Sequence, residues 1–193
     1  MTLPANAALL VIDVQQGLDD PRCGERNNPG LERNIAALLA AWRRTGRPVI
    51  HVQHMSTNSD SPLRPDRPGN AFKPEAAPEA GEPVFQKTVN SAFIGTALEA
   101  QLRGQGIDTL VLAGMTTDQC VSSTTRMAAN LGFTAIVVSD GTATFERTGP
   151  DGEHYTAEEM HRHELASLHQ EFATIRRTGE VLEEIGVLDP AGR

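Results

Sequence analysis

Short runs of consecutive apolar residues recur along the chain, separated by stretches with helical spacing. The first run, residues 7–13, reads AALLVID and ends in a carboxylate. Such a run, without polar alternation, is typical of a strand buried on both faces of a parallel sheet. Similar runs follow, so the pattern predicts six strands; the other five lie at 48–52, 84–86, 109–113, 135–138 and, less distinctly, 172–175.

Helical patterns lie between most of these runs. Apolar side chains recur at intervals of three and four residues in two stretches, which places them on one face of a helix. These positions are Leu31, Ile35, Leu38, Leu39 and Trp42 in the first stretch, and Ile94, Leu98 and Leu102 in the second. A further helix is predicted over 157–171, where a few apolar residues among many charges indicate one packed and one solvated face.

Strands joined by helices imply right-handed crossovers and a sheet covered on both faces. The predicted fold class is therefore α/β, a three-layer α/β/α arrangement around a six-stranded, mainly parallel sheet. A length of 193 residues suits a single domain, 1–193. Segment 56–83, rich in Pro, Ser, Asn and Gly, is longer than an ordinary connection and is interpreted as either a lid or an oligomer contact.

The net charge and the number of cysteines indicate which classes of ligand and which cellular compartment to expect. The formal net charge of −8 disfavours binding to nucleic acid or to an anionic membrane surface, so we expect a small-molecule ligand. No apolar run approaches the ~20 residues that cross a bilayer, and no secretory leader is evident. With Cys23 and Cys120 as the two cysteines, we expect free thiols and a cytoplasmic protein.

Three reactive side chains fall where predicted strands end. Asp13 ends the first strand, Lys87 follows the third, and Cys120 opens the helix after the fourth. Ligands of open parallel sheets bind beyond the carboxyl ends of the strands, so these side chains should meet in one crevice. Unpaired N–H groups in a first helical turn stabilise negative charge, so we expect a lowered pKa for the Cys120 thiol.

Each of these residues also has a structural interpretation. Asp13 could cap a turn, Lys87 could be a solvated lysine at a strand edge, and Cys120 could pack its helix against the sheet. Two alternatives to an enzyme follow. The chain could be a non-catalytic small-ligand-binding α/β domain, or a redox-sensing thiol protein, although no resolving cysteine lies near Cys120 in the sequence.

The three reactive residues lie in the segments 10–15 (LVIDVQ), 87–93 (KTVNSAF) and 114–121 (GMTTDQCV). Through these segments the chain resembles the isochorismatase-like cysteine hydrolases, and the resemblance covers nearly its whole length. That family includes nicotinamidases, N-carbamoylsarcosine amidohydrolase and streptothricin hydrolase. The resemblance implies a catalytic triad of Asp13, Lys87 and Cys120 and a cis peptide between Met115 and Thr116. It also implies hydrolysis of an amide, carbamoyl or lactam C–N bond through a thioester on Cys120, in a homodimer or homotetramer.

The backbone N–H groups of Thr116 and Cys120 are the expected oxyanion donors. We further expect Gln15, His54 and Phe93 to line the substrate cleft, while Arg64 and Arg67 are given no role.

The resemblance departs from the nicotinamidases at residues 52–54. Those enzymes bind a metal through Asp-x-His, whereas this chain reads Val52, Gln53, His54. We therefore expect no metal, and the mechanism needs no cofactor. His161, His163 and His169 are interpreted as part of the solvated face of a charged helix.

Overall fold

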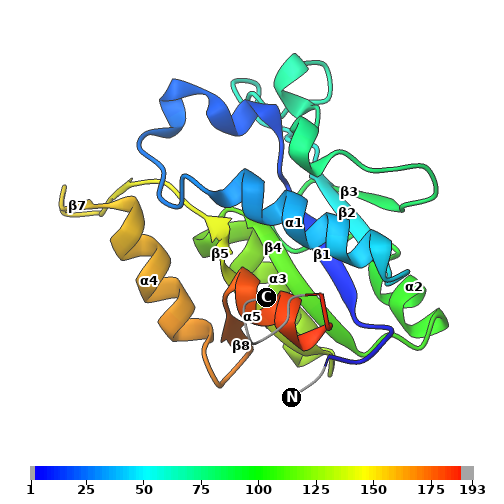
Figure 1. The fold of residues 1–193 in the computed structure, drawn as a ribbon. Coiled ribbons are helices and arrows are strands. Elements are labelled where there is room, and N and C mark those ends of the chain that lie inside the picture. Colours follow the sequence, from blue (N-terminus) through cyan, green and yellow to red (C-terminus); the bar gives the residue numbers. More distant parts are fainter. Residues whose placement is uncertain (1–2, 188–193) are drawn as a thin grey trace.

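Six strands form one sheet in the computed structural model, which describes residues 3–187 (Figure 1). The strand order is β3-β2-β1-β4-β5-β8, and every neighbouring pair is parallel. All six predicted strands are therefore confirmed, in a sheet that is wholly rather than mainly parallel. Their bounds are β1 Ala8–Ile12, β2 Val49–His54, β3 Val84–Lys87, β4 Thr109–Met115, β5 Thr134–Ala143 and β8 Thr174–Arg176.

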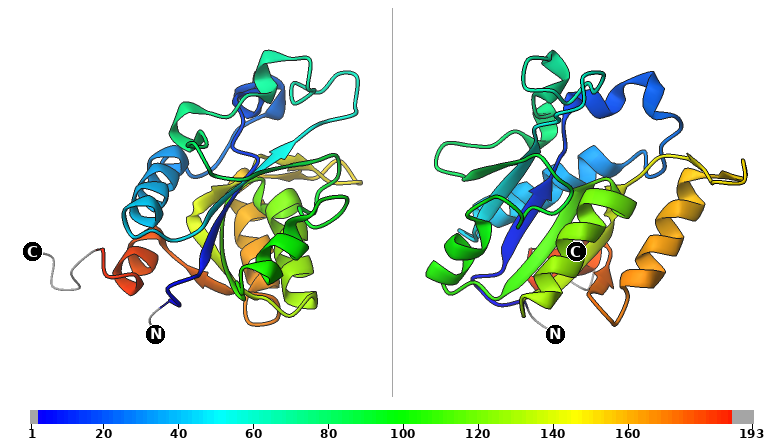
Figure 2. Two further views of the ribbon diagram at one scale, coloured as in Figure 1. Left: turned by 90° about the vertical axis from the view of Figure 1, so that its right-hand side faces the viewer. Right: turned by 180° about the vertical axis from the view of Figure 1, so that it is seen from behind.

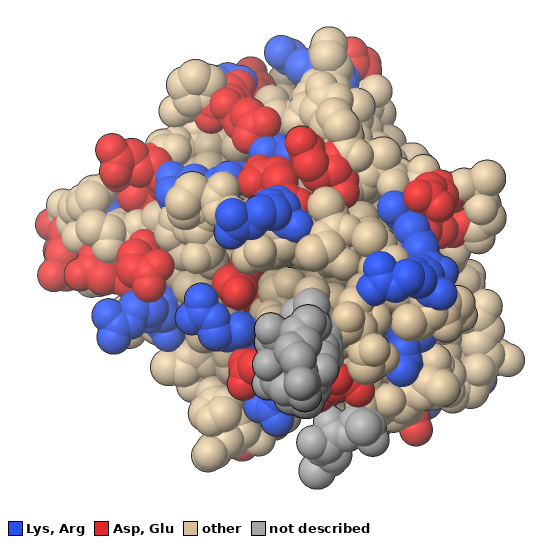
Figure 3. Space-filling model, viewed as in Figure 1, with Lys and Arg blue, Asp and Glu red and all other residues tan. Residues whose placement is uncertain are grey.

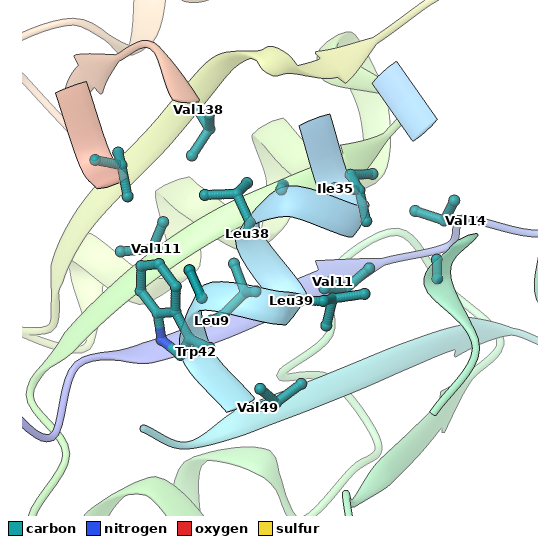
Figure 4. Packing of buried hydrophobic residues seen from close by; sticks show 14 of the residues in the cluster. Leu9, Val11, Val14, Ile35, Leu38, Leu39, Trp42, Val49, Val111 and Val138 are labelled. Atoms are coloured by element: carbon teal, nitrogen blue, oxygen red, sulfur yellow. The ribbon is translucent and has the colours of Figure 1, made fainter. Parts of the chain in front are cut away.

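Helices cover both faces of this sheet, which confirms the three-layer prediction (Figure 2). On one face lie α1 (Leu31–Arg44) and α5 (Thr178–Glu184); on the other lie α2 (Leu98–Gly104), α3 (Ser122–Asn130) and α4 (Ala157–Leu168). The apolar stripe of α1 packs on alternate residues of β1 and β4, with Trp42 beside Leu9 and Val111 (Figure 4). The Trp42 indole also donates to the Ala7 carbonyl, 3.0 Å away, so its polar atom is satisfied inside the core.

Some boundaries differ from the prediction. The helix expected from Ile94 begins at Leu98, and Ile94 is instead an exposed loop residue. The helix expected over 157–171 ends at Leu168. The short helix α5 and a two-stranded hairpin of β6 (Arg147–Thr148) and β7 (His154–Tyr155) were not predicted, because elements of this length carry too little periodicity.

Close contact between β1 and β4 depends on Gly114. Its φ of 127° lies in a region that favours glycine, and a Cβ at this position would lie 2.0 Å from the Ile12 carbonyl oxygen. Since β1 ends next to Asp13 and β4 leads into Cys120, this contact brings the ends of the two strands together.

Basic and acidic side chains both lie on the face that carries α1 and α5 (Figure 3). None of the helices within residues 3–187 combines the length and apolar character needed to cross a bilayer.

Candidate active site

Asp13, Lys87 and Cys120 meet at the carboxyl end of the sheet. The Lys87 ammonium donates to Asp13 Oδ2 at 2.6 Å and to Cys120 Sγ at 3.2 Å. All three residues are buried, and the Lys87 side chain is fully enclosed. The sequence-based prediction that these strand ends converge is therefore confirmed by the geometry, and the cation bridges the carboxylate and the thiol.

The local backbone places each group. Asp13 has a φ of 52°, a left-handed conformation that is uncommon outside glycine and is retained where the surroundings hold it, often at functional sites. Cys120 lies in a wide helical turn, Thr117–Val121, that leads into α3. The Thr116 carbonyl accepts the N–H groups of Gln119 and Val121, both at 3.1 Å, and the Met115–Thr116 peptide is cis, as the resemblance implied.

Burial controls the protonation of this site. It raises the pKa of Asp13, although Lys87 acts in the opposite direction. Burial and, next, the charge of Asp13 raise the pKa of the Cys120 thiol to about 12. The expected lowering of this pKa is therefore wrong, because desolvation and the carboxylate outweigh the nearby cation. One oxygen of the Asp13 carboxylate, Oδ1, is buried without a partner among residues 3–187.

His54 completes the inner cluster. Its Nδ1 lies 3.2 Å from Lys87 Nζ, and burial together with that cation lowers the pKa of His54 to about 4. Ligand atoms of Asp13, His54 and Cys120 all lie within 4.8 Å of one another, a spacing that would suit a metal ion. The donor set does not fit one, however, because the Lys87 ammonium contacts all three groups and would repel a second cation.

A small cavity opens onto this cluster. Its volume is about 100 Å³, and it is lined by Asp13, Leu18, His54, Leu63, Asn90, Met115, Thr116, Gln119 and Cys120. The structure thus brings His54, Met115 and Thr116 to the cavity together with Asp13 and Cys120. Leu18, Leu63, Asn90 and Gln119 were missed by the sequence analysis. Asn90 and Gln119 lie in the segments that carried the resemblance, so that signal was available for them.

Two expected substrate contacts lie elsewhere. Gln15 is fully buried, and its amide bridges main-chain groups, accepting from His54 N–H and donating to the carbonyls of His54 and Asn70. Phe93 is buried against Phe133, with ring centroids 5.8 Å apart. Neither side chain lines the cavity, because Gln15 joins two chain segments and Phe93 packs in the core beside α2.

His161 corrects a further interpretation. Instead of belonging to a solvated helix face, it is buried, and its Nδ1 lies 2.9 Å from Thr117 Oγ1 in the turn that holds Cys120. Burial lowers the pKa of His161, which favours the neutral ring. A single histidine facing inward on a highly charged helix leaves no periodic signal in the sequence.

Residues 7–180 match the family model of the isochorismatase domain. This chain belongs to the isochorismatase family. The isochorismatase family protein YrdC of Bacillus subtilis is 44% identical over 177 residues, which cover 92% of this chain and 95% of YrdC. Maleamate amidohydrolase of Pseudomonas putida is 35% identical over 150 residues, covering 69% of this chain and 70% of that enzyme.

The fold agrees with this assignment. The crystal structure of an isochorismatase-family protein from Chromobacterium violaceum superimposes with a TM-score of 0.93 at 44% identity, covering 97% of this chain and 99% of that one. Other relatives include the streptothricin hydrolase of Streptomyces noursei and the N-carbamoylsarcosine amidase of Thermoplasma acidophilum, two activities that the sequence resemblance had named. The chain is an isochorismatase-family hydrolase with a six-stranded parallel sheet.

Proposed function

We propose that this isochorismatase-family hydrolase cleaves a C–N bond of a small molecule, in an amide, carbamoyl or lactam group, through a thioester on Cys120. The contact of the Lys87 ammonium with both Asp13 and Cys120 is the observation that carries the proposal. This contact supports the proposal because it joins a cation to a carboxylate and a thiol that line one cavity, the groups that covalent catalysis by a cysteine requires.

The first half of the reaction forms the thioester. Asp13 takes the proton from the Cys120 thiol, and Sγ attacks the carbonyl carbon, forming a C–S bond while the carbonyl oxygen becomes an oxyanion. The backbone N–H groups of Thr116 and Cys120 are the proposed donors to this oxyanion. The C–N bond then breaks, and protonated Asp13 gives its proton to the departing nitrogen.

The second half regenerates the enzyme. Asp13 takes a proton from water, the resulting hydroxide attacks the thioester carbonyl, and the C–S bond breaks to release a carboxylic acid. The thiol is restored when Asp13 returns its proton to Sγ. Lys87 exchanges no proton in either half of the proposed reaction, and its role is to stabilise whichever neighbour, carboxylate or thiolate, is negative at each step.

Relatives support hydrolysis over the alternatives. Maleamate amidohydrolase and streptothricin hydrolase both match this chain over more than two thirds of its length. Amide hydrolysis by the first enzyme and hydrolysis by the second are properties of those enzymes, and they are transferred to this chain as part of the proposal. A homodimer or homotetramer is likewise proposed for this chain.

The test combines turnover with capture of the intermediate. The purified protein and its Cys120→Ala variant are incubated with a panel of small amides, carbamoyl compounds and lactams, and released ammonia or amine is measured. We expect Cys120→Ala to lose activity by roughly 10³-fold or more, as removal of a nucleophile does. Acid quenching followed by peptide mass spectrometry should find the acyl group on Cys120.

Turnover that survives in Cys120→Ala would contradict the proposal. Reversible binding of the panel compounds by both proteins, with no turnover by either, would favour the non-catalytic binding domain. Rapid conversion of Cys120 to a sulfenic acid by peroxide, without turnover of any compound, would favour the redox sensor.

A further inference from the structure

The wall of the active-site cavity offers no free cationic side chain among residues 3–187. We infer that the cavity takes uncharged substrates and discriminates against amides that carry a carboxylate close to the scissile bond. This inference rests on the proposed function and specifies its substrate class. It separates the chain from its relative maleamate amidohydrolase, whose named substrate carries a carboxylate.

The cations nearest to the chemistry are already engaged. Lys87 is enclosed and directs its ammonium to Asp13, Cys120 and His54, so none of its donors faces the cavity. His54 lines the cavity, but burial and Lys87 lower its pKa to about 4, so its ring is neutral at physiological pH. Neither group can neutralise a substrate anion.

Arginines around the cavity also have partners. Arg26 lies beside Met115, 3.9 Å from its sulfur, but pairs with Glu32 through both of its terminal nitrogens. Arg147 approaches the Cys120 turn only to pair with Asp118, at 3.3 Å. These carboxylates hold the two guanidinium groups away from any ligand in the cavity.

The segment that supplies Leu63 to the cavity holds two further arginines. Arg64 pairs with its neighbour Asp66 at 2.8 Å, and Arg67 donates to the Ser59 carbonyl at 3.3 Å. Neither side chain lines the cavity, and Arg67 lies on a separate hollow beside Asp19 and Asp20. The long loop therefore contributes an apolar side chain to the site and no positive charge.

What the cavity does offer suits a neutral polar group. Thr116 Oγ1 and Asp13 Oδ1 are buried in its wall without a partner among residues 3–187, and the amides of Asn90 and Gln119 line its mouth. A carboxamide can donate to the Asp13 carboxylate and bond to the Thr116 hydroxyl, whereas a carboxylate can only be repelled by the former. A volume of about 100 Å³, well below the ~300 Å³ of a typical ligand pocket, keeps the substrate group small.

Two alkylating reagents of nearly equal size test this inference without a known substrate. Iodoacetamide is neutral and iodoacetate is anionic, and both transfer a two-carbon unit to a thiol with loss of iodide. Labelling rates at Cys120 and Cys23 are followed by peptide mass spectrometry at about pH 8, near the pKa of a free thiol. The same chain unfolded in urea gives the intrinsic ratio of the two reagents at each cysteine.

We expect folding to shift the iodoacetamide-to-iodoacetate ratio at Cys120 by roughly tenfold or more, because an unpaired carboxylate is costly to bury. A ratio at Cys120 that folding leaves unchanged, or that shifts toward iodoacetate, would overturn the inference and leave the proposed function standing. Labelling of folded Cys120 by both reagents should be slow, because burial and Asp13 raise the pKa of its thiol to about 12, so the ratio of the two rates is the diagnostic quantity. The proposed function is tested separately, by the turnover of Cys120→Ala.

A charge introduced at the mouth of the cavity provides a second arm. Gln119→Arg supplies the missing cation at an exposed position, and Gln119→Met is the neutral control of similar length. We expect the arginine, but not the methionine, to improve the relative rate of iodoacetate at Cys120 by roughly two- to fivefold, the range of a solvent-exposed charge pair. Equal effects of the two variants would contradict the assigned role of charge.

Discussion

Two buried lysines, Lys87 and Lys73, illustrate different uses of the same residue type. Lys73 lies in the long segment between β2 and β3, and its ammonium pairs with Asp19 at 2.5 Å and Glu32 at 2.7 Å. Glu32 also pairs with Arg26, so two cations face two carboxylates. Lys87 has one carboxylate partner, a thiol and an imidazole, and its carboxylate keeps one oxygen unpaired.

The ion pairs of Lys73 join chain segments, whereas the ion pair of Lys87 with Asp13 is available for chemistry. The Lys73 cluster ties the long segment to α1 and to the turn after β1, and its charges are balanced. Around Lys87, a polar atom is buried without a partner, which is costly unless a ligand supplies that partner. Between these two lysines, incomplete pairing of the carboxylate partner, rather than burial, distinguishes the candidate site.

The largest expected difference lies in activity. Lys87→Met should lower kcat/KM by roughly 10³-fold, since the thiolate and the carboxylate lose their shared cation. Lys73→Met should keep kcat/KM within about threefold but lower the free energy of unfolding by about 1–3 kcal/mol, because Glu32 keeps Arg26 and Asp19 is solvent-exposed. Turnover assays and urea unfolding measure the two effects, and similar losses of activity in both variants would remove the distinction.

Asp13→Asn should separate nucleophile ionisation from proton transfer. The charge of Asp13 contributes to the raised pKa of Cys120, so its removal lowers that pKa and increases alkylation of Cys120 at about pH 8. Hydrolysis should nevertheless fall by roughly 10²- to 10⁴-fold, because the proton acceptor is lost. Iodoacetamide labelling across pH and ammonia release provide the two readouts. Slower alkylation in parallel with slower hydrolysis would argue against Asp13 as the base.

The smallest expected effect concerns the pH dependence of the free energy of unfolding. Glu32 and His54 should each lower this free energy over a different acidic pH range. Burial opposes ionisation of Glu32, but Arg26 and Lys73 outweigh it and hold the pKa of Glu32 at about 2, below the unfolded value of 4.5. Its contribution is fully present above pH 4.5 and is lost as the pH falls toward 2; after solvent screening it amounts to about 1–2 kcal/mol.

Protonation of His54 affects the free energy of unfolding at a higher pH than protonation of Glu32 does. Its pKa of about 4 lies below the unfolded value of 6.5, so the unfolded chain binds more protons between these values and stability falls as the pH drops from 6.5 to 4. In urea unfolding at stepped pH, His54→Gln should reduce the slope of the upper range, to which the buried His51 and His161 also contribute, and Glu32→Gln should reduce the slope of the lower one. If either variant changed the other's range, the two lysine clusters would be coupled rather than independent.

The sequence was sufficient for the sheet and for the three reactive residues, because both depend on where parallel strands end. It was insufficient for the cavity wall. Gln15 lies two residues after Asp13, which has a left-handed backbone, and its side chain bonds to the main chain of His54, a contact that spacing does not reveal. Leu63 reaches the site from an irregular segment without periodicity, and the raised pKa of Cys120 depends on burial that only the folded chain defines.

Gly114 sets a condition on the approach of Asp13 and Cys120 in this chain. A single added methyl group would meet the Ile12 carbonyl at 2.0 Å and push the two central strands apart, together with the acid and the nucleophile at their ends. A glycine that contacts no substrate should therefore tolerate exchange as poorly as the nucleophile itself. Anyone who transfers this acid and this nucleophile to another parallel sheet must therefore carry over the glycine six positions before the cysteine as well.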